Sequence, residues 1–234
     1  VEELEEIEVL MKSVKKKNIE ISLRVNPDVD ANTHKKISTG RSEDKFGIPL
    51  HKVLGIFKKF RRNSNINITG LAVHIGSQIT TIKPFEVAFQ KLRKLILKLK
   101  QQGFNIYKVD LGGGIGIIYS NNKVISLEDY KNVVKTNFSD LNLKIFFEPG
   151  RSLVGSSGIL ISRVIRQKKG ENNNFLIIDC AMNDLIRPSM YDSYHEIFPV
   201  KRNKDKEVSY DVVGPICESS DAFAKQRKIG QLKR

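Results

Sequence analysis

Hydrophobic positions in the first two thirds of the chain follow two alternating periods. Short apolar runs, typical of strands, alternate with longer stretches in which apolar residues recur every three or four positions, typical of amphipathic helices. Strands are predicted to begin near residues 21, 70, 107 and 144. Helices are predicted over residues 2–17, 51–61, 85–99 and 127–137. This alternation of strands and helices predicts an α/β fold with a parallel sheet.

Residues capable of chemistry follow each predicted strand at its carboxyl end. The four motifs are Asn26-Pro27-Asp28, His74-Ile75-Gly76-Ser77, Asp110-Leu111-Gly112-Gly113-Gly114 and Glu148-Pro149-Gly150-Arg151. A (β/α)₈ barrel carries its active site on the face formed by these strand ends, so the pattern favours a barrel. A doubly wound sheet, which binds ligands where its strand order reverses, is the alternative. A whole barrel needs about 250 residues, and four units predict half of one.

Beyond Arg151 the sequence becomes rich in β-forming residues. Residues 157–165, 175–180 and 208–213 are predicted to be extended, with a single helix near residues 221–228. We therefore expect two domains: residues 1–151, with four of the eight βα units of a barrel, and residues 152–234, part of a β-sandwich or β-barrel domain.

Composition limits the classes of protein to which the chain can belong. Its 234 residues are 40% hydrophobic, and no apolar run approaches the roughly 20 residues of a membrane span. Two cysteines predict no disulfide framework and a reducing, cytoplasmic setting. The net charge of +14 is spread without a nucleic-acid motif, so neither nucleic acid nor membrane is an expected partner. Val1 already lies inside a predicted helix, so we expect the natural protein to begin earlier.

Several motif residues have both a structural and a functional interpretation. Glu148 and Arg151 are either a surface ion pair at a turn or a carboxylate and a guanidinium fixed at the end of a rigid strand. Residues 112–114 form either a flexible loop or a backbone that approaches a phosphate closely. A Rossmann fingerprint is excluded because Ile117 occupies the position of its third glycine. His74 is either a core histidine or a ring stacked on a planar cofactor, with Ser77 donating to a phosphate.

The last third of the chain adds a second set of candidates. Cys217 lies among glycine, proline and polar residues, which indicates a presented loop where a thiol can exchange protons, whereas Cys180 is predicted to be core. Arg187 and Tyr191 offer a guanidinium and a phenol suited to an anionic substrate. No set of residues has metal-ligand spacing, so no metal is expected.

Five motifs occur together and in order. They are His74-Ile-Gly-Ser-Gln78, Asp110-Leu-Gly-Gly-Gly114, Glu148-Pro-Gly-Arg151, Asp184-Leu-Ile-Arg-Pro188 through Tyr191, and Val213-Gly-Pro-Ile-Cys-Glu-Ser-Ser-Asp221. Together they resemble the diaminopimelate decarboxylase family, pyridoxal-phosphate enzymes of the alanine-racemase-like barrel class. Thr39-Gly40 and Lys45-Phe46-Gly47 are similar to that family's long loop. The resemblance covers nearly the whole chain and implies the second half of the pyridoxal-phosphate-binding TIM barrel.

The resemblance also implies roles for individual residues. Pyridoxal 5'-phosphate would be bound by a set that supplies the ring contacts and the phosphate site: His74, Ser77, Gly112, Gly113, Gly114, Glu148, Pro149, Gly150 and Arg151. Meso-2,6-diaminopimelate, the implied substrate, would be bound by Arg151, Arg187, Tyr191 and Glu218. Glu148 would hold the pyridine nitrogen protonated. Cys217 would be catalytic and reprotonate the carbanion in the active site of a second subunit, because the family shares its sites across a homodimer. The products would be L-lysine and CO₂, the last step of lysine biosynthesis.

Two departures from the family pattern limit these implications. The family's Schiff-base lysine lies on the first barrel strand, and nothing in this chain matches it; Lys45 belongs to the loop motif. The Gly-Ala-Tyr motif near the family's C-terminus is also absent. We therefore expect a fragment that neither binds the cofactor covalently nor turns over alone.

Besides a nucleic-acid-binding module, which is the weakest alternative, two other interpretations remain open. One is another basic-amino-acid decarboxylase of the same fold, for ornithine, arginine or carboxynorspermidine; Gln78 and Glu218 favour diaminopimelate. The other is a non-catalytic remnant or a pseudoenzyme partner subunit, which the missing lysine favours and the intact Cys217 and Glu148 oppose.

Overall fold

The computed structural model describes residues 1–13, 18–31, 39–41, 43–63, 65–120, 123–201 and 206–230. The chain divides into two compact units. The first comprises Val1–Ile117 and Lys123–Gly155, and the second comprises Ile118–Asn122 and Ser156–Arg234. No helix in the described ranges is long and apolar enough to cross a membrane.

The first unit is built on a parallel sheet in the order β2-β1-β3-β4-β5. Its strands are β1 (Ile19–Asn26), β2 (Ile48–Pro49), β3 (Ile66–Ala72), β4 (Lys108–Asp110) and β5 (Lys144–Phe146). The four strands β1, β3, β4 and β5 are neighbours in chain order and run in one direction. A doubly wound sheet would reverse this order, so the arrangement is that of a barrel arc.

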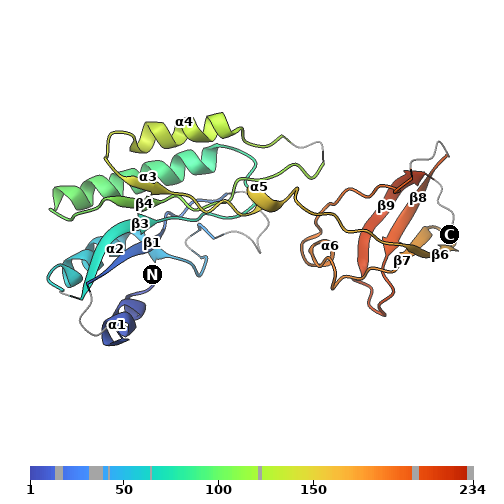
Figure 1. Ribbon diagram of the computed structural model, residues 1–234, viewed down its shortest axis with the longest axis horizontal. Coiled ribbons are helices and arrows are strands. Elements are labelled where there is room, and N and C mark those ends of the chain that lie inside the picture. Colours follow the sequence, from blue (N-terminus) through green and yellow to red (C-terminus); the bar gives the residue numbers. More distant parts are fainter. Residues whose placement is uncertain are drawn as a thin grey trace. The chain divides into compact units, whose positions relative to one another are not determined.

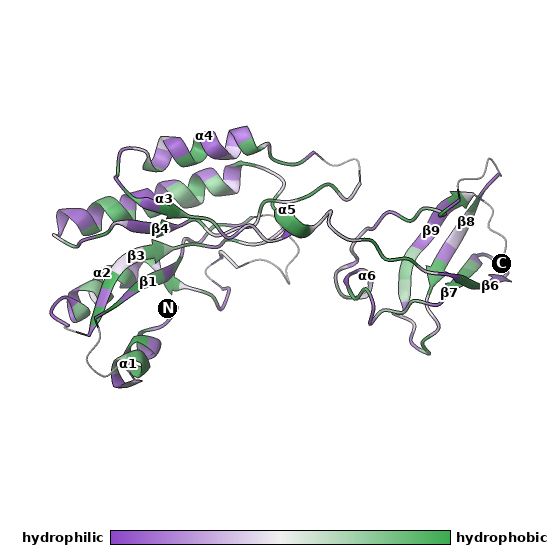
Figure 2. Cartoon of the chain, viewed as in Figure 1, coloured by the Kyte–Doolittle hydropathy of each residue, from purple (hydrophilic) through white to green (hydrophobic). Residues whose placement is uncertain are grey.

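Helices lie between and beside these strands along the chain (Figure 1). They are α1 (Leu4–Ser13), α2 (Leu50–Phe60), α3 (Lys83–Gln101), α4 (Leu127–Phe138) and the short α5 (Arg151–Val154). Ser126 caps α4, because its Oγ accepts a hydrogen bond from the Asp129 amide at 3.0 Å. Figure 2 shows hydrophobic and hydrophilic positions alternating along α3 and α4, as expected for helices with one buried face.

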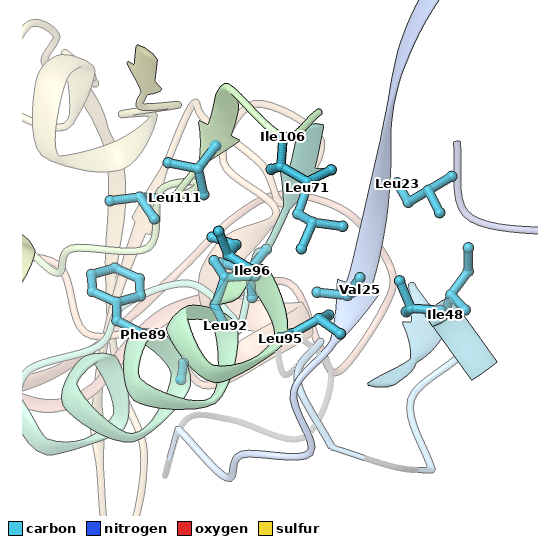
Figure 3. Packing of buried hydrophobic residues seen from close by; sticks show 14 of the residues in the cluster. Leu23, Val25, Ile48, Leu71, Phe89, Leu92, Leu95, Ile96, Ile106 and Leu111 are labelled. Atoms are coloured by element: carbon cyan, nitrogen blue, oxygen red, sulfur yellow. The ribbon is translucent and has the colours of Figure 1, made fainter. Parts of the chain in front are cut away.

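The main core lies between this sheet and its helices. Leu92, Leu95 and Ile96 of α3 lie among Leu71 and Leu111 of the sheet side (Figure 3). An aromatic cluster extends this core to α4, and its members are Phe85, Phe89, Tyr130 and Phe138. The apolar face of α3 predicted from the sequence is therefore the face that packs on the sheet.

Polar side chains occupy the other face of the same sheet. Successive side chains of a strand point to opposite faces, so the residues between the core positions face away from the helices. Arg24, Ala72, Asp110 and Phe146 are register partners across four strands and form one row on that face. A buried core on one face and ionisable groups on the other leave the second face available for a ligand.

The second unit has its own four-stranded sheet, in the order β6-β7-β8-β9. Its elements are β6 (Val164–Lys169), β7 (Asn174–Ile178), α6 (Arg187–Tyr191), β8 (Glu207–Val213) and β9 (Ala222–Gly230). β7 and β8 are parallel and the outer pairs are antiparallel. A small separate core includes Leu176, Tyr210, Val212 and Phe223.

The structure corrects several predicted elements. The predicted helix at residues 221–228 is wrong, because β9 pairs there with β8 and buries Phe223 and Ile229. Residues 157–163 belong to no strand, and the sheet starts only at Val164. The two-residue strand β2 was too short to be predicted, and residues 14–17 of the predicted first helix lie outside the described residues. A domain boundary between residues 151 and 152 falls within α5.

Replacing Leu92 by Ala tests the packing of α3. Leu92 is fully buried, so the substitution removes apolar contacts and leaves a cavity that costs about 2–5 kcal/mol of unfolding free energy. Urea unfolding of the first unit would measure this loss. Lys94→Ala, on the exposed side of the same helix, is the matched control and should change the stability by less than about 0.5 kcal/mol.

Candidate functional site

The carboxyl ends of β3, β4 and β5 converge on three residues. Beyond the row of Arg24 and Asp110, the next residues on the polar face are His74, Gly112 and Glu148. The Glu148 amide donates to the Gly112 carbonyl at 2.8 Å, and the Gly113 amide donates to Nδ1 of His74 at 3.2 Å. The structure thus brings together three of the predicted site motifs at one edge of the sheet.

His74 is held as a neutral ring by its surroundings. Burial lowers its pKa, the nearby Arg24 guanidinium lowers it further, and Asp110 opposes these effects. Since Nδ1 accepts a hydrogen bond from Gly113, the proton of the neutral ring is on Nε2. The backbone is fixed as well, because Thr39 Oγ1 donates to the His74 carbonyl at 2.9 Å. A flat, neutral imidazole in a fixed position is suited to stack on a planar group.

Glycines 112–114 have a structural role that the sequence did not reveal. A Cβ on Gly113 would lie 2.1 Å from the Glu148 carbonyl oxygen, and one on Gly112 would lie 2.3 Å from the Val73 carbonyl oxygen. One on Gly114 would lie 2.4 Å from the Gly76 carbonyl oxygen. These glycines therefore let the ends of neighbouring strands approach one another, whether or not a phosphate lies beside them.

The amide groups of this loop differ in what they can offer an anion. The Gly112 amide donates to Oδ1 of Asp110 at 2.9 Å, and the Gly113 amide donates to His74. Within the described part of the chain the Gly114 amide has no acceptor. Of the three, Gly114 is thus the one whose N–H is available for a phosphate oxygen.

The motif after β5 places a carboxylate and a guanidinium beside this loop. Glu148 is exposed, and a Cβ on Gly150 would meet no atom within 4 Å, so the turn after Glu148 is open. Arg151 begins α5, and its Nη1 donates to Oε1 of Gln78 at 3.1 Å. Gln78 comes directly after Ser77, a half-buried residue of the His74 motif.

In the second unit Arg187 lies between two aromatic rings. Its guanidinium carbon is 5.3 Å from the Tyr119 ring centroid and 5.7 Å from that of Tyr191, and its Nη2 donates to Ser193 Oγ at 3.1 Å. Its Nε is buried and has no acceptor among the described residues. A positioned guanidinium with an unused buried donor is suited to an anionic ligand.

The loop over residues 214–221 presents Cys217 and is organised by Asp221. Cys217 and Glu218 are exposed, whereas Asp221 is 3% exposed. The carboxylate of Asp221 accepts from the Met182 amide at 2.7 Å and the Ile216 amide at 2.8 Å. It thereby ties the cysteine loop to the segment that leads into α6.

A second hydrogen bond joins the same two segments. Ser189 of α6 donates to the Ser220 carbonyl. The structure thus brings the elements that carry Arg187, Tyr191, Cys217 and Glu218 together within the second unit. Cys180 is buried in the small core, as expected.

The donor set of the first unit fits a planar cofactor that carries a phosphate and a basic ring nitrogen. His74 supplies a flat neutral ring, the exposed Glu148 supplies an acceptor for a protonated ring nitrogen, and Gly114 supplies a free amide. Among the residues that the structure describes, no group of three His, Cys, Asp or Glu residues is arranged to hold a metal ion.

Sequence reasoning missed the supporting residues of both units. Asp221 ends the cysteine motif but gave no indication of its burial, and Thr39 lies far from His74 in the sequence. Gln78 was noted as a motif residue that favours diaminopimelate, but its contacts with Ile117 and Arg151 were not predicted. The Gly214 amide donates to the Asp221 backbone carbonyl at 2.9 Å, which closes the loop between these two residues. The seven-residue spacing from Gly214 to Asp221 is the sequence pattern that indicates such a closed loop.

Comparisons with known proteins agree with this arrangement. Residues 1–155 match the family described as pyridoxal-dependent decarboxylase, pyridoxal binding domain. The chain is 41% identical over 237 aligned positions to a diaminopimelate decarboxylase of Zymomonas mobilis, covering 100% of this chain and 56% of that protein. A diaminopimelate decarboxylase of Aquifex aeolicus is also 41% identical, with the same coverage.

A solved structure is similar as well. The crystal structure of diaminopimelate decarboxylase from Helicobacter pylori complexed with L-lysine has a TM-score of 0.94 and 37% identity, covering 100% of this chain and 59% of that one. The chain thus spans a little over half the length of the curated relatives that it matches.

The titration of His74 tests the electrostatics of the first site. NMR titration of the histidine ring protons should give His74 a pKa below 6.5. Arg24→Gln should raise the pKa of His74, because it removes a nearby positive charge. Since the folded-state pKa is below the unfolded one, stability present above pH 6.5 should be lost as the pH falls through the folded-state pKa. A His74 pKa at its ordinary value would contradict this account.

Replacing Asp221 by Asn tests the organisation of the cysteine loop. The side-chain amide can accept from only one of the two backbone N–H groups, and a buried N–H left unpaired costs about 1–3 kcal/mol. We expect faster hydrogen exchange at Ile216 or Met182 and a lower melting temperature of the second unit. Asp192→Asn, at an exposed position, should leave both unchanged. Equal exchange in the two variants would show that Asp221 does not hold the loop.

Proposed function

The chain belongs to the pyridoxal-dependent decarboxylase family, and from this premise we propose that it forms part of a diaminopimelate decarboxylase. The reaction is the conversion of meso-2,6-diaminopimelate to L-lysine and CO₂. The main support is the convergence of His74, Gly112 and Glu148 at one sheet edge, in a chain whose relatives carry that name. Because the chain spans about half of those relatives, we propose that the activity requires residues beyond these 234, including the lysine that binds the cofactor.

Each residue of the first unit has a defined task in this proposal. Bound pyridoxal phosphate supplies an electron sink for the electron pair left on carbon when CO₂ departs. Glu148 would accept the hydrogen bond of the protonated ring nitrogen and so keep the proton there. His74, neutral because of its lowered pKa, stacks on the ring without adding a positive charge. Ser77, Gly114 and the backbone of residues 149–151 would hold the phosphate.

The second unit supplies substrate recognition and the proton. Arg187 and Tyr191 bind the carboxylate that is retained in the product, and Glu218 accepts from the distal ammonium group of the substrate. The Cys217 thiol donates its proton to the carbon that has lost CO₂, and the thiolate then takes a proton from water, so the charge balances. The exposure of Cys217 and Glu218 supports this assignment.

Assembly and location are part of the same proposal. We propose a homodimer in which the exposed Cys217 loop of one copy completes the site of the other. We also propose a cytoplasmic protein. Its two cysteines, one exposed and one buried, are both free thiols.

Substrate identity is tested by CO₂ release. The longest natural protein that contains this sequence, supplied with pyridoxal phosphate, should release CO₂ from meso-diaminopimelate at least about 100-fold faster than from ornithine or arginine. The reason is that the site also binds the amino and carboxylate groups at the other end of diaminopimelate. A preference for ornithine or arginine would identify another basic-amino-acid decarboxylase of this fold. No release from any of them would favour a non-catalytic protein.

Replacing Cys217 by Ala tests the source of the proton. Loss of a positioned proton donor typically lowers the rate by about 10²–10⁴-fold. We expect that fall in kcat, with the absorbance of the bound cofactor unchanged because Cys217 does not hold the ring. Cys180→Ala is the matched control and should keep kcat within about twofold. A wild-type rate in the Cys217 variant would assign the proton to another group.

A further inference from the structure

Gln78 has a left-handed backbone conformation, which is unusual for a residue other than glycine. Its φ is +60°, in the left-handed region, where a side chain costs about 1–2 kcal/mol relative to the right-handed form and glycine is the usual choice. The residue lies in the loop after β3, four positions from His74. The hydrogen bonds of its long polar side chain can offset this cost, which glycine could not do.

The carboxamide of Gln78 uses both of its ends. Its Nε2 donates to the Ile117 carbonyl at 2.7 Å, and its Oε1 accepts from the Ile117 amide at 3.1 Å. The side chain thus pairs with the backbone of the glycine-rich loop as a strand would. Gly116 permits this, because a Cβ there would lie 3.2 Å from the Gln78 amide group. The amide is therefore fixed in position and in orientation.

The same Oε1 also accepts from Nη1 of Arg151 at 3.1 Å. Gln78 consequently joins three strand-end loops through one rigid group: its own, the glycine-rich loop and the start of α5. A neutral oxygen directs the guanidinium without cancelling its charge. A carboxylate in its place would pair with the guanidinium and compete with an anionic ligand.

We propose that Gln78 is a positioning residue that directs Arg151 toward the carboxylate of the bound amino acid. This inference rests on the proposed function and specifies how one end of the substrate is recognised. The carboxylate concerned is the one retained in the product, so L-lysine carries it and 1,5-diaminopentane, the same molecule without that group, does not.

Product binding provides a test that does not depend on turnover. Isothermal titration calorimetry measures the binding of L-lysine and of 1,5-diaminopentane to the longest natural protein that contains this sequence, loaded with pyridoxal phosphate. Gln78→Met, which keeps the length and removes the hydrogen bonds, should weaken L-lysine binding about tenfold and leave diamine binding within twofold. Gln78→Glu should weaken L-lysine binding at least as much, because the new carboxylate pairs with Arg151. Gln101→Met, at the exposed end of α3, is the matched control.

A double-mutant cycle identifies the route of the effect. If Gln78 acts through Arg151, adding Gln78→Met to the Arg151→Lys variant should weaken L-lysine binding by less than a further twofold. The proposal is overturned if the losses of L-lysine affinity in the two single variants add in the double variant. It is also overturned if Gln78→Met weakens the binding of both ligands equally, or if the wild-type protein binds both ligands with equal affinity. Failure of the proposed function is separate: it is an absence of CO₂ release from diaminopimelate, and it leaves the comparison of the two ligands intact.

Discussion

The close approach of backbone at glycines 112–114 is the constraint on which the first site depends. Parallel strands bring their carboxyl ends to one edge, but the chains leaving those ends would normally diverge. In this protein the glycine-rich loop lies against the backbone of Val73, Gly76 and Glu148 without intervening side chains. The same contact places His74 and Glu148 on either side of Gly112, so the spacing of the chemical groups follows from the packing of the main chain.

The fold of the first unit was predictable from the sequence for a specific physical reason. Apolar residues of α3 and of β1 repeat with the periods of helix and strand, and strand ends are marked by Pro or Gly. The second unit was harder. β9 contains Lys225, Gln226, Arg227 and Lys228, four consecutive polar residues that lack the alternation of a half-buried strand. Its placement depends on pairing with β8, a tertiary contact that no local pattern encodes.

The site residues divide in the same way. His74, Glu148 and Cys217 were identifiable because a strand end or a polar loop marks each of them, and their chemical roles remain proposals. The residues that hold them were not identifiable. Asp221 and Thr39 act on backbone groups brought close only by folding, and Gln78 acts through a backbone conformation that its residue type does not indicate. Sequence patterns therefore show the reactive groups more readily than the hydrogen bonds that orient them.

The exposed edge of the first sheet has a practical consequence. In the described part of the chain β5 pairs only with β4. Its last residue, Phe146, and the next residue, Phe147, are 47% and 49% exposed. A strand with unused hydrogen-bonding groups and adjacent apolar side chains is a template for aggregation. Recombinant preparation of these residues by themselves would thus favour inclusion bodies. Soluble material would require co-expression with a segment that covers the β5 edge, or a lysine in place of one of the two phenylalanines.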